Sequence, residues 1–190
     1  NGMVGSAIWR TLTAKGYTNL IGVTSKELDL RNQQAVQEFI NQNKPEVIID
    51  AAAKVGGILA NNNYPYQFIM ENMQIQNNLI DTALKTLKEL GILIYRRNGK
   101  SNINQSINKS LNLILQKRKI DDLESLPVMT DPYKLKAIQI LQQIMSSTAT
   151  TDPLLHIKII LKQIDLFINH GNSPESAATY SYYGMILCGS

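Results

Sequence analysis

The sequence has a single cysteine and no long apolar run. Because Cys188 is alone, no disulfide can form within the 190-residue chain, which suits a reducing compartment. No apolar stretch approaches the ~18 residues that a membrane-spanning helix needs, and no secretory signal opens the chain. We therefore expect a cytoplasmic protein with no membrane partner.

Aromatic side chains and strong charge are also scarce. Aromatics make up 6% of the residues, and the formal net charge is +4. The basic clusters Arg96-Arg97 and Lys117-Arg118-Lys119 have no aromatics between them, so we expect no nucleic-acid binding. The two histidines, His156 and His170, have no cysteine or carboxylate at ligand spacing, so we expect no metal site.

What the chain does have, at its opening, is a pair of glycines in the run NGMVGSA. In a dinucleotide-binding loop, glycines allow a tight turn and close approach of the pyrophosphate to a helix N-terminus. Gly2 and Gly5 match the second and third glycines of G-x-x-G-x-x-G, with no strand or first glycine before them. The pattern predicts a nucleotide-binding unit that is incomplete. Two glycines are a weak motif, so the decision rests on other residues.

Helical and strand-like segments alternate over the first part of the chain. Residues 6–14, 32–43 and 65–81 carry apolar side chains at helical spacing. Residues 19–24 (NLIGVT) and 47–49 (VII) have the composition of buried strands. This order predicts an α/β fold of the doubly wound, Rossmann type, truncated to about half.

Three segments carry a resemblance to a known family. They are DAAAKVGGI at residues 50–58, ANNNYP at 60–65 and FIMENMQIQNNLID at 68–81. Together with GMVGSA at 2–7 and ELDL at 27–30, they resemble the GDP-L-fucose synthases. Those enzymes are NADP-dependent epimerase/reductases of the extended short-chain dehydrogenase class. The resemblance covers about residues 1–83, which we take as an incomplete NAD(P)-binding domain.

The resemblance implies the residues of a cofactor site. One set lies under the pyrophosphate, one beside the adenine, and one along the cofactor at the end of a strand. The residues are Gly2, Met3, Val4 and Gly5; Asp29 and Leu30; and Ala51, Ala52 and Ala53. On the residues alone, the three alanines could serve only close packing, and Asn61, Asn62 and Asn63 could form only a polar turn.

The expected cofactor is NADP, but the chain departs from the family in the residues that hold its 2′-phosphate. Family members often use one arginine in the glycine loop and one after the second strand. This chain has Asn1 at the first place, and Val23, Thr24 and Ser25 around the second. Lys26 supplies a point charge but not the planar fork of arginine. The choice between NADP and NAD therefore stays open.

A catalytic tyrosine is missing from the sequence. Chemistry of this class needs a tyrosine as general acid/base with a lysine four residues later, which lowers the tyrosine pKa. None of the eight tyrosines has lysine at that position, and the nearest pair, Tyr133 and Lys136, is three apart. We expect no catalytic residues in this chain, and no turnover of GDP-4-keto-6-deoxy-mannose.

From residue 84 onward, helical periodicity replaces the alternation. Ile103, Ile107, Leu111 and Ile114 recur at helical spacing. The pairs Asp131-Pro132, Asp152-Pro153 and Ser173-Pro174 recur every 21 residues, each an N-cap residue followed by proline at the first helical position. This predicts an all-α helical-repeat segment over residues 84–190.

The helical segment resembles a second family. The segments at 121–132 (DDLESLPVMTDP), 169–173 (NHGNS) and 183–189 (YGMILCG) are similar to the helical region of large multi-sensor kinases with an AAA-type ATPase part. This resemblance implies a non-catalytic module that binds a protein partner. The whole chain is then interpreted as a chimera or misjoined fragment, with the join between residues 82 and 87.

Overall fold

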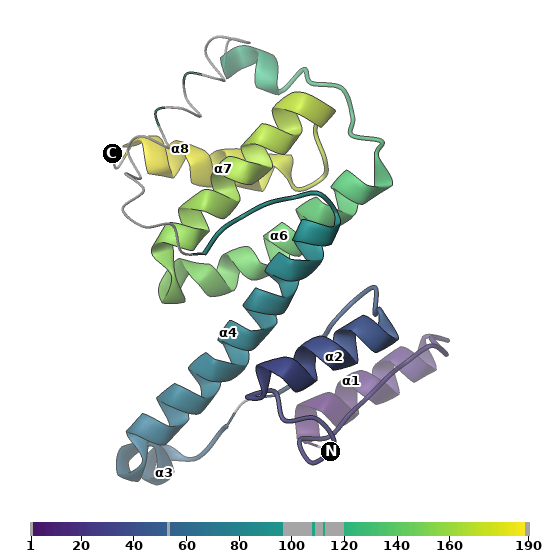
Figure 1. Cartoon of the computed structure of the whole chain (residues 1–190), viewed down its shortest axis with the longest axis vertical. Coiled ribbons are helices and arrows are strands. Elements are labelled where there is room, and N and C mark those ends of the chain that lie inside the picture. The colour runs from purple at the N-terminus through teal and green to yellow at the C-terminus, as the bar shows by residue number, and fades with distance from the viewer. Residues whose placement is uncertain (1, 53, 97–107, 109–111, 113–119, 189–190) are drawn as a thin grey trace. The chain divides into compact units, whose positions relative to one another are not determined.

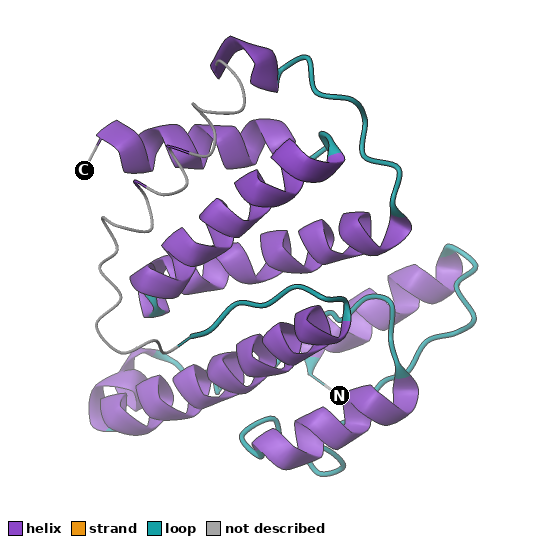
Figure 2. Ribbon diagram, turned by 45° about the horizontal axis from the view of Figure 1, so that its top comes forward, coloured by secondary structure: helices purple, strands orange, loops and turns teal. Residues whose placement is uncertain are grey.

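Helices account for all the regular structure longer than a single bridge in the described residues, as Figure 2 shows. The computed structural model describes residues 2–52, 54–96, 108, 112 and 120–188 (Figure 1). Contacts divide the chain into a first unit, residues 1–82, and a second unit, residues 83–190. The helices are α1 (Met3–Ala14), α2 (Gln33–Asn43), α3 (Ile58–Asn63), α4 (Pro65–Glu89), the 3-10 helix η1 (Ile120–Leu123), α6 (Pro132–Thr151), α7 (Pro153–His170) and α8 (Ser176–Cys188).

Helix α2 and the C-terminal end of α1 lie where the sequence predicts them, whereas α1 begins at Met3, three residues earlier than predicted. Gly16 follows α1 with φ of 86°, a left-handed conformation that ends a helix at little cost for glycine. Asn32 caps α2, because its side chain accepts a hydrogen bond from the Ala35 N–H at 3.1 Å. Lys44 ends α2 with φ of 44°.

The predicted strands are wrong for the described structure. Residues 19–24 and 47–49 are not strands, and neither are residues 92–94. A helix satisfies its backbone groups within its own segment, whereas a strand needs a neighbour on which to form a ladder. No described segment forms a ladder with residues 19–24 or 47–49. The apolar side chains of the strand-like segments are accordingly exposed; Val47, for example, is 74% exposed.

Helix α4 is longer than the sequence predicts, since it ends at Glu89 and not near Asp81. The apolar spacing continues beyond the predicted end: Ile80 and Leu87, seven residues apart, are both buried. Gly91, with φ of 76°, then turns the chain, and the Ile92 N–H bonds to the Leu87 carbonyl at 2.8 Å. The helix therefore passes through the boundary between the two units.

The second unit is built on α6, α7 and α8, which pack in consecutive pairs (Figure 1). Two of its three predicted N-caps are confirmed: Asp131 accepts from the Tyr133 and Lys134 N–H groups, and Asp152 accepts from that of Leu155. The third is wrong by a few residues, because α8 begins at Ser176 after a turn. The core of this unit is apolar, and its fully buried side chains include Ile138, Leu141, Leu155, Ile159, Ile160 and Phe167.

Gly171 lets the turn after α7 pair with the segment at residues 127–129. The Asn172 N–H bonds to the Pro127 carbonyl and the Met129 N–H bonds to the Asn172 carbonyl, both at 2.7 Å. Gly171 has φ of 97°, and a Cβ there would lie 2.2 Å from the Pro127 carbonyl oxygen. Only glycine fits at this position.

The helical repeat over residues 84–190 stays a prediction. Part of that segment lies outside the described residues, including the apolar residues Ile103, Ile107, Leu111 and Ile114. The basic residues Arg97 and 117–119 also lie outside them. Within the parts that the structure describes, no helix is both long and apolar enough to span a bilayer.

Candidate cofactor site

The N-terminus of α1 offers backbone donors to an anion. Gly2 is the N-cap and makes no side-chain capping bond, and the first turn holds no acidic residue. The N–H groups of Met3 and Val4 have no acceptor among the described residues, and both side chains are exposed. A Cβ on Gly2 would meet nothing within 4 Å, so the approach is open. Unpaired N–H groups and the helix dipole together favour a negative charge here.

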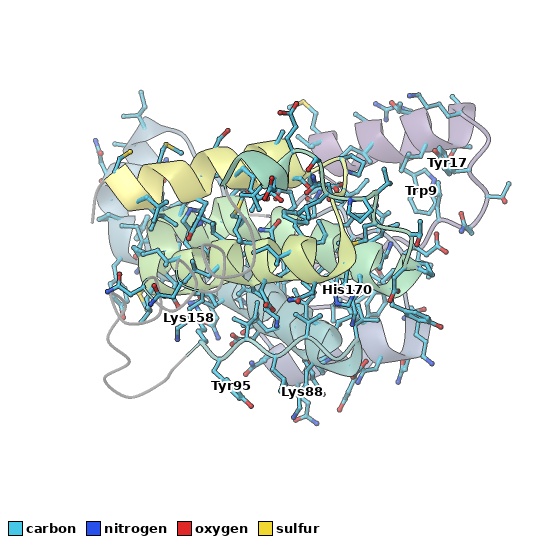
Figure 3. All side chains as sticks on the ribbon, turned by 90° about the horizontal axis from the view of Figure 1, so that it is seen from above. Trp9, Tyr17, Lys88, Tyr95, Lys158 and His170 are labelled. Carbon is cyan, nitrogen blue, oxygen red and sulfur yellow. The ribbon has the colours of Figure 1, made fainter. Side chains whose placement is uncertain are left out.

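One face of α1 contacts two segments that lie far apart in the sequence. A Cβ on Gly5 would lie 3.6 Å from the Cβ of Ala51. One turn later, Trp9 projects from α1 (Figure 3). A Cβ on Gly22 would lie 2.7 Å from its ring. The structure therefore brings the glycine loop against the alanine segment, and residue 22 against the same face of the helix.

Four charged side chains link the predicted adenine segment to the residue after the alanines. Arg31 donates from Nε and Nη2 to the Asp29 carboxylate, at 2.9 and 2.8 Å. Its Nη1 donates to Glu71 Oε2 at 2.9 Å, and the other Glu71 oxygen accepts from Lys54 Nζ. The bonds from Arg31 lower the Asp29 pKa to about 2, and the bond from Lys54 is the main cause of a lowered Glu71 pKa. We call these four residues the charge cluster.

Amide side chains of α4 hold the same two segments by their backbones. Asn72 accepts from the Lys54 N–H at 2.7 Å and donates to the Lys54 carbonyl at 3.0 Å. Gln74 donates to the Arg31 carbonyl, and Asn78 donates to that of Leu30. Asn72 thus satisfies both backbone groups of one residue, as a neighbouring strand would.

A shallow hollow of about 470 Å³ extends the site beyond Lys54. Its lining is mainly apolar with amide groups at intervals. The lining residues are Lys54, Val55, Gly56, Asn61, Phe68, Ile69, Asn72, Met73 and Gln76. The Lys54 ammonium lies 5.6 Å from the centre of the Phe68 ring, a cation–π distance.

The predicted site residues fall into two groups within the first unit. Gly2, Met3, Val4 and Gly5 lie at the start of α1, and a Cβ on Gly5 would lie 3.6 Å from the Ala51 Cβ. Ala52 follows in a turn held by Asp50, and Ala53 lies outside the described residues. Asp29 and Leu30 are tied to α4 by the charge cluster and by Asn78.

The role of α4 in the site is not predicted from the sequence. Glu71, Asn72 and Asn78 lie in the 68–81 segment, which indicates a helix and carries the family resemblance but gives these side chains no role. One signal in the sequence could have indicated this role. The helix carries amide and carboxylate side chains near its apolar face, and such polar groups are hydrogen-bonded when they are buried.

A comparison with protein families identifies the family of the chain that carries this site. The model of the NAD dependent epimerase/dehydratase family matches residues 1–95. The chain belongs to the NAD dependent epimerase/dehydratase family. This places a Rossmann-type domain at the N-terminus, although the described residues are helical and contain no strand.

Curated members of the epimerase/dehydratase family are similar over the same part of the chain. GDP-L-fucose synthase 1 of Arabidopsis thaliana is 56% identical over 82 residues, 43% of this chain and 25% of that protein. GDP-L-fucose synthase of Escherichia coli is 48% identical over 82 residues, 43% of this chain and 26% of that protein. GDP-L-colitose synthase of Yersinia pseudotuberculosis is 42% identical over 94 residues, 47% of this chain and 30% of that protein. The chain spans about a quarter of the length of these epimerase relatives.

The resemblance to a sensor kinase or AAA-type ATPase has no support from these comparisons, which concern the epimerase family. The Tyr133 and Lys136 pair lies in the first turn of α6, in the second unit.

The start of α1 fits the pyrophosphate of the nicotinamide cofactor that the family uses. It has a glycine with open space around it, and its first N–H groups have no acceptor among the described residues.

Proposed function

We propose that the N-terminal unit binds a nicotinamide dinucleotide, NADP, as the cofactor part of a GDP-sugar epimerase/reductase. The relatives named as GDP-L-fucose synthases support GDP-4-keto-6-deoxy-mannose as the substrate of the whole enzyme. The observation that supports the proposal is the approach of Gly5 to Ala51, where a Cβ on Gly5 would lie 3.6 Å from the Ala51 Cβ, because it puts the helix end beside the alanine segment.

Each part of the site has a binding role in this proposal. The N–H groups at the start of α1 hold the pyrophosphate, with Gly2 leaving room for it. The small side chains of Ala51 and Ala52 let a flat ligand lie close to the backbone, and Asp29 lies beside the adenosine. When bound, the reduced cofactor supplies a hydride.

We infer that this chain lacks the general acid that reactions of this class use. A tyrosine with lysine at the fourth following position is absent from the sequence. We therefore propose that the chain binds its cofactor without turning over substrate. Its chemistry would need a tyrosine–lysine pair from outside these 190 residues.

The chain carries its own reporter for a binding experiment. Trp9 is the sole tryptophan, and it lies one turn after Gly5 on the face of α1 that contacts the site. Reduced nicotinamide absorbs where tryptophan emits, so bound NADPH quenches Trp9 by energy transfer. We expect saturable quenching by NADPH, relieved by excess oxidised NADP. A linear, unsaturated response up to millimolar NADPH would refute the proposal.

We also propose a separate role for the second unit, as a helical protein-interaction module. Its apolar core and its N-capped helices favour independent folding. Residues 83–190 expressed alone should melt cooperatively when helix content is followed by circular dichroism. A gradual, featureless melt would count against this second role.

A further inference from the structure

Helix α8 has no charged residue on either of its faces. On one face Ser176, Thr179 and Tyr183 are buried, and Thr179 bonds to Gln163 of α7. The opposite face is exposed, yet the whole helix reads SAATYSYYGMILC, without Asp, Glu, Lys or Arg. A helix at a protein surface normally turns charged side chains outward, opposite the face that packs on the core. The outward face of α8 therefore has the composition of a contact surface.

Helix α6, the other helix that packs on α7, has a different outward face (Figure 1). Its exposed positions include the polar residues Gln139, Gln143, Ser146 and Thr150. In stacks of helices, a terminal element that faces solvent needs a polar outer surface. Helix α6 meets this condition, whereas α8 has the composition of a helix with a further layer packed on it.

Four exposed residues of α8 form a stripe along one face of the helix. Ala178, Ser181, Tyr182 and Met185 follow the spacing i, i+3, i+4 and i+7, which brings them onto the same face. The Met185 side chain is 61% exposed. The Tyr182 ring meets the His156 ring of α7 edge-on, with 6.1 Å between the ring centres, so its position is held by the unit itself. We call Ala178, Ser181, Tyr182 and Met185 the outer seam.

The outer seam is complementary in size to a reversed copy of itself. Two small side chains are followed by two large ones, spaced symmetrically about the point between Ser181 and Tyr182. When a second α8 crosses this point in the antiparallel direction, Tyr182 meets Ser181 of the other copy, and Met185 meets Ala178. Large side chains opposite small ones let two helices interdigitate. Because neither seam carries a charge, no ionised group has to leave water.

We propose that the outer seam of α8 binds the outer seam of a second copy of the chain, in an antiparallel pair related by a two-fold axis. This inference rests on the helical interaction module proposed for the second unit, and it names the partner of that module. The 13 residues of α8 span about 20 Å. A contact of that length buries less than the roughly 800 Å² per partner of a stable dimer, so the pair is weak and reversible.

Sedimentation equilibrium of the full chain measures this pairing between about 10 µM and about 1 mM, where a weak interface becomes populated. We expect the average molar mass to rise reversibly with concentration. Met185→Lys places a charge against the apolar seam of the other copy and should raise the dimer dissociation constant at least about tenfold. Gln143→Lys is the matched control, because it adds the same charge at an exposed position of α6. It should leave the constant within about twofold of the wild-type value.

A disulfide between copies tests the antiparallel register. In a Cys188→Ser background, Ala178→Cys combined with Met185→Cys should give a covalent dimer under mild oxidation, since the two positions face each other across the seam. Within one helix they are about 10.5 Å apart, which is too far for a disulfide. No covalent dimer from the combined variant, or an equal yield from Ala178→Cys without Met185→Cys, would overturn the antiparallel arrangement.

The outcomes separate this inference from the interaction role on which it rests. If the chain stays monomeric, or if Met185→Lys and Gln143→Lys affect pairing equally, pairing through the outer seam is refuted. The interaction module then stands, with a helix of a different protein as its partner. If residues 83–190 melt without cooperativity, both proposals fall. If circular dichroism shows that Met185→Lys does not fold, Ala178→Lys takes its place, and an unchanged dissociation constant in that variant refutes the inference.

Discussion

Gly5 faces Ala51 closely enough that a Cβ on Gly5 would touch the Ala51 side chain, although 45 residues separate them in the chain. A Cβ on Gly5 would lie 3.6 Å from the Ala51 Cβ, an ordinary van der Waals distance. The start of α1 therefore lies close to the alanine segment, with room for one more carbon at Gly5.

The Asn72 side chain hydrogen-bonds both backbone groups of Lys54, and removing it should destabilise the segment around Lys54. Asn72→Ala removes two hydrogen bonds to the Lys54 backbone, each worth about 0.5–1.5 kcal/mol net. We expect the free energy of unfolding of the first unit to fall by about 1–3 kcal/mol. Amide exchange at Lys54 should also become faster. Asn62→Ala, at an exposed position on α3, is the control, and equal effects of the two substitutions would contradict this role.

Acid should remove the contribution of the charge cluster to stability. The pKa of Asp29 is lowered to about 2 by its bonds to Arg31, below its value in an unfolded chain of about 3.9. A lowered pKa gives stability that is fully present above about pH 4 and is lost as the pH falls toward 2. Asp29→Asn should therefore be less stable than wild type in urea at pH 6, and the difference should vanish near pH 2. A difference that is constant across this range would show that the ion pair does not contribute.

Gly171 should tolerate no side chain. Its φ of 97° and the predicted 2.2 Å approach of a Cβ to the Pro127 carbonyl combine strain with a clash against backbone. We expect Gly171→Ala to destabilise the second unit by more than about 2 kcal/mol in urea unfolding. Gly184→Ala is the matched control on α8, where a Cβ meets nothing within 4 Å. It should be neutral or stabilising by about 0.5–1 kcal/mol, and similar losses for the two variants would contradict the account.

A buried hydrogen bond joins α7 and α8. Thr179 Oγ1 donates to Gln163 Oε1 at 3.1 Å, and both side chains are fully buried. Thr179→Val keeps the shape but leaves the Gln163 oxygen without this donor, at a cost of about 1–3 kcal/mol. Ser181→Ala, exposed on the same helix, should change the unfolding free energy by less than about 0.5 kcal/mol. Thermal melts of the two variants decide the matter, because equal midpoints would exclude a structural role for the bond.

Local features of the fold could be predicted from the sequence. The extent of α2 and the two Asp-Pro helix starts are set by residues within a few positions of each other. The strands at 19–24 and 47–49 could not, because a strand depends on partners that lie elsewhere in the chain. Ile21 and Val47 have strand-like composition, but their side chains are exposed and their backbones are not in a ladder.

The candidate site likewise has features that a local sequence pattern predicts and features that depend on distant residues. The glycine loop is visible as a motif in the sequence, but its closeness to Ala51 is known only from the structure. The ion pairs of Glu71 join Arg31, 40 positions away, to Lys54, 17 positions away. No local pattern predicts such pairs, since they depend on how α4 packs in the first unit.

The central claim is that the start of α1 holds the cofactor pyrophosphate, and a pair of substitutions at Gly2 tests it most directly. Gly2→Asp and Gly2→Asn both fit the open space and both cap α1, so each should raise helix stability by a few tenths of a kcal/mol. Only aspartate places a negative charge where the phosphates would lie. We predict that the dissociation constant for NADPH is at least about fivefold higher for Gly2→Asp than for Gly2→Asn, since like charges at close range repel. Equal constants for the two variants and the wild type would contradict the account.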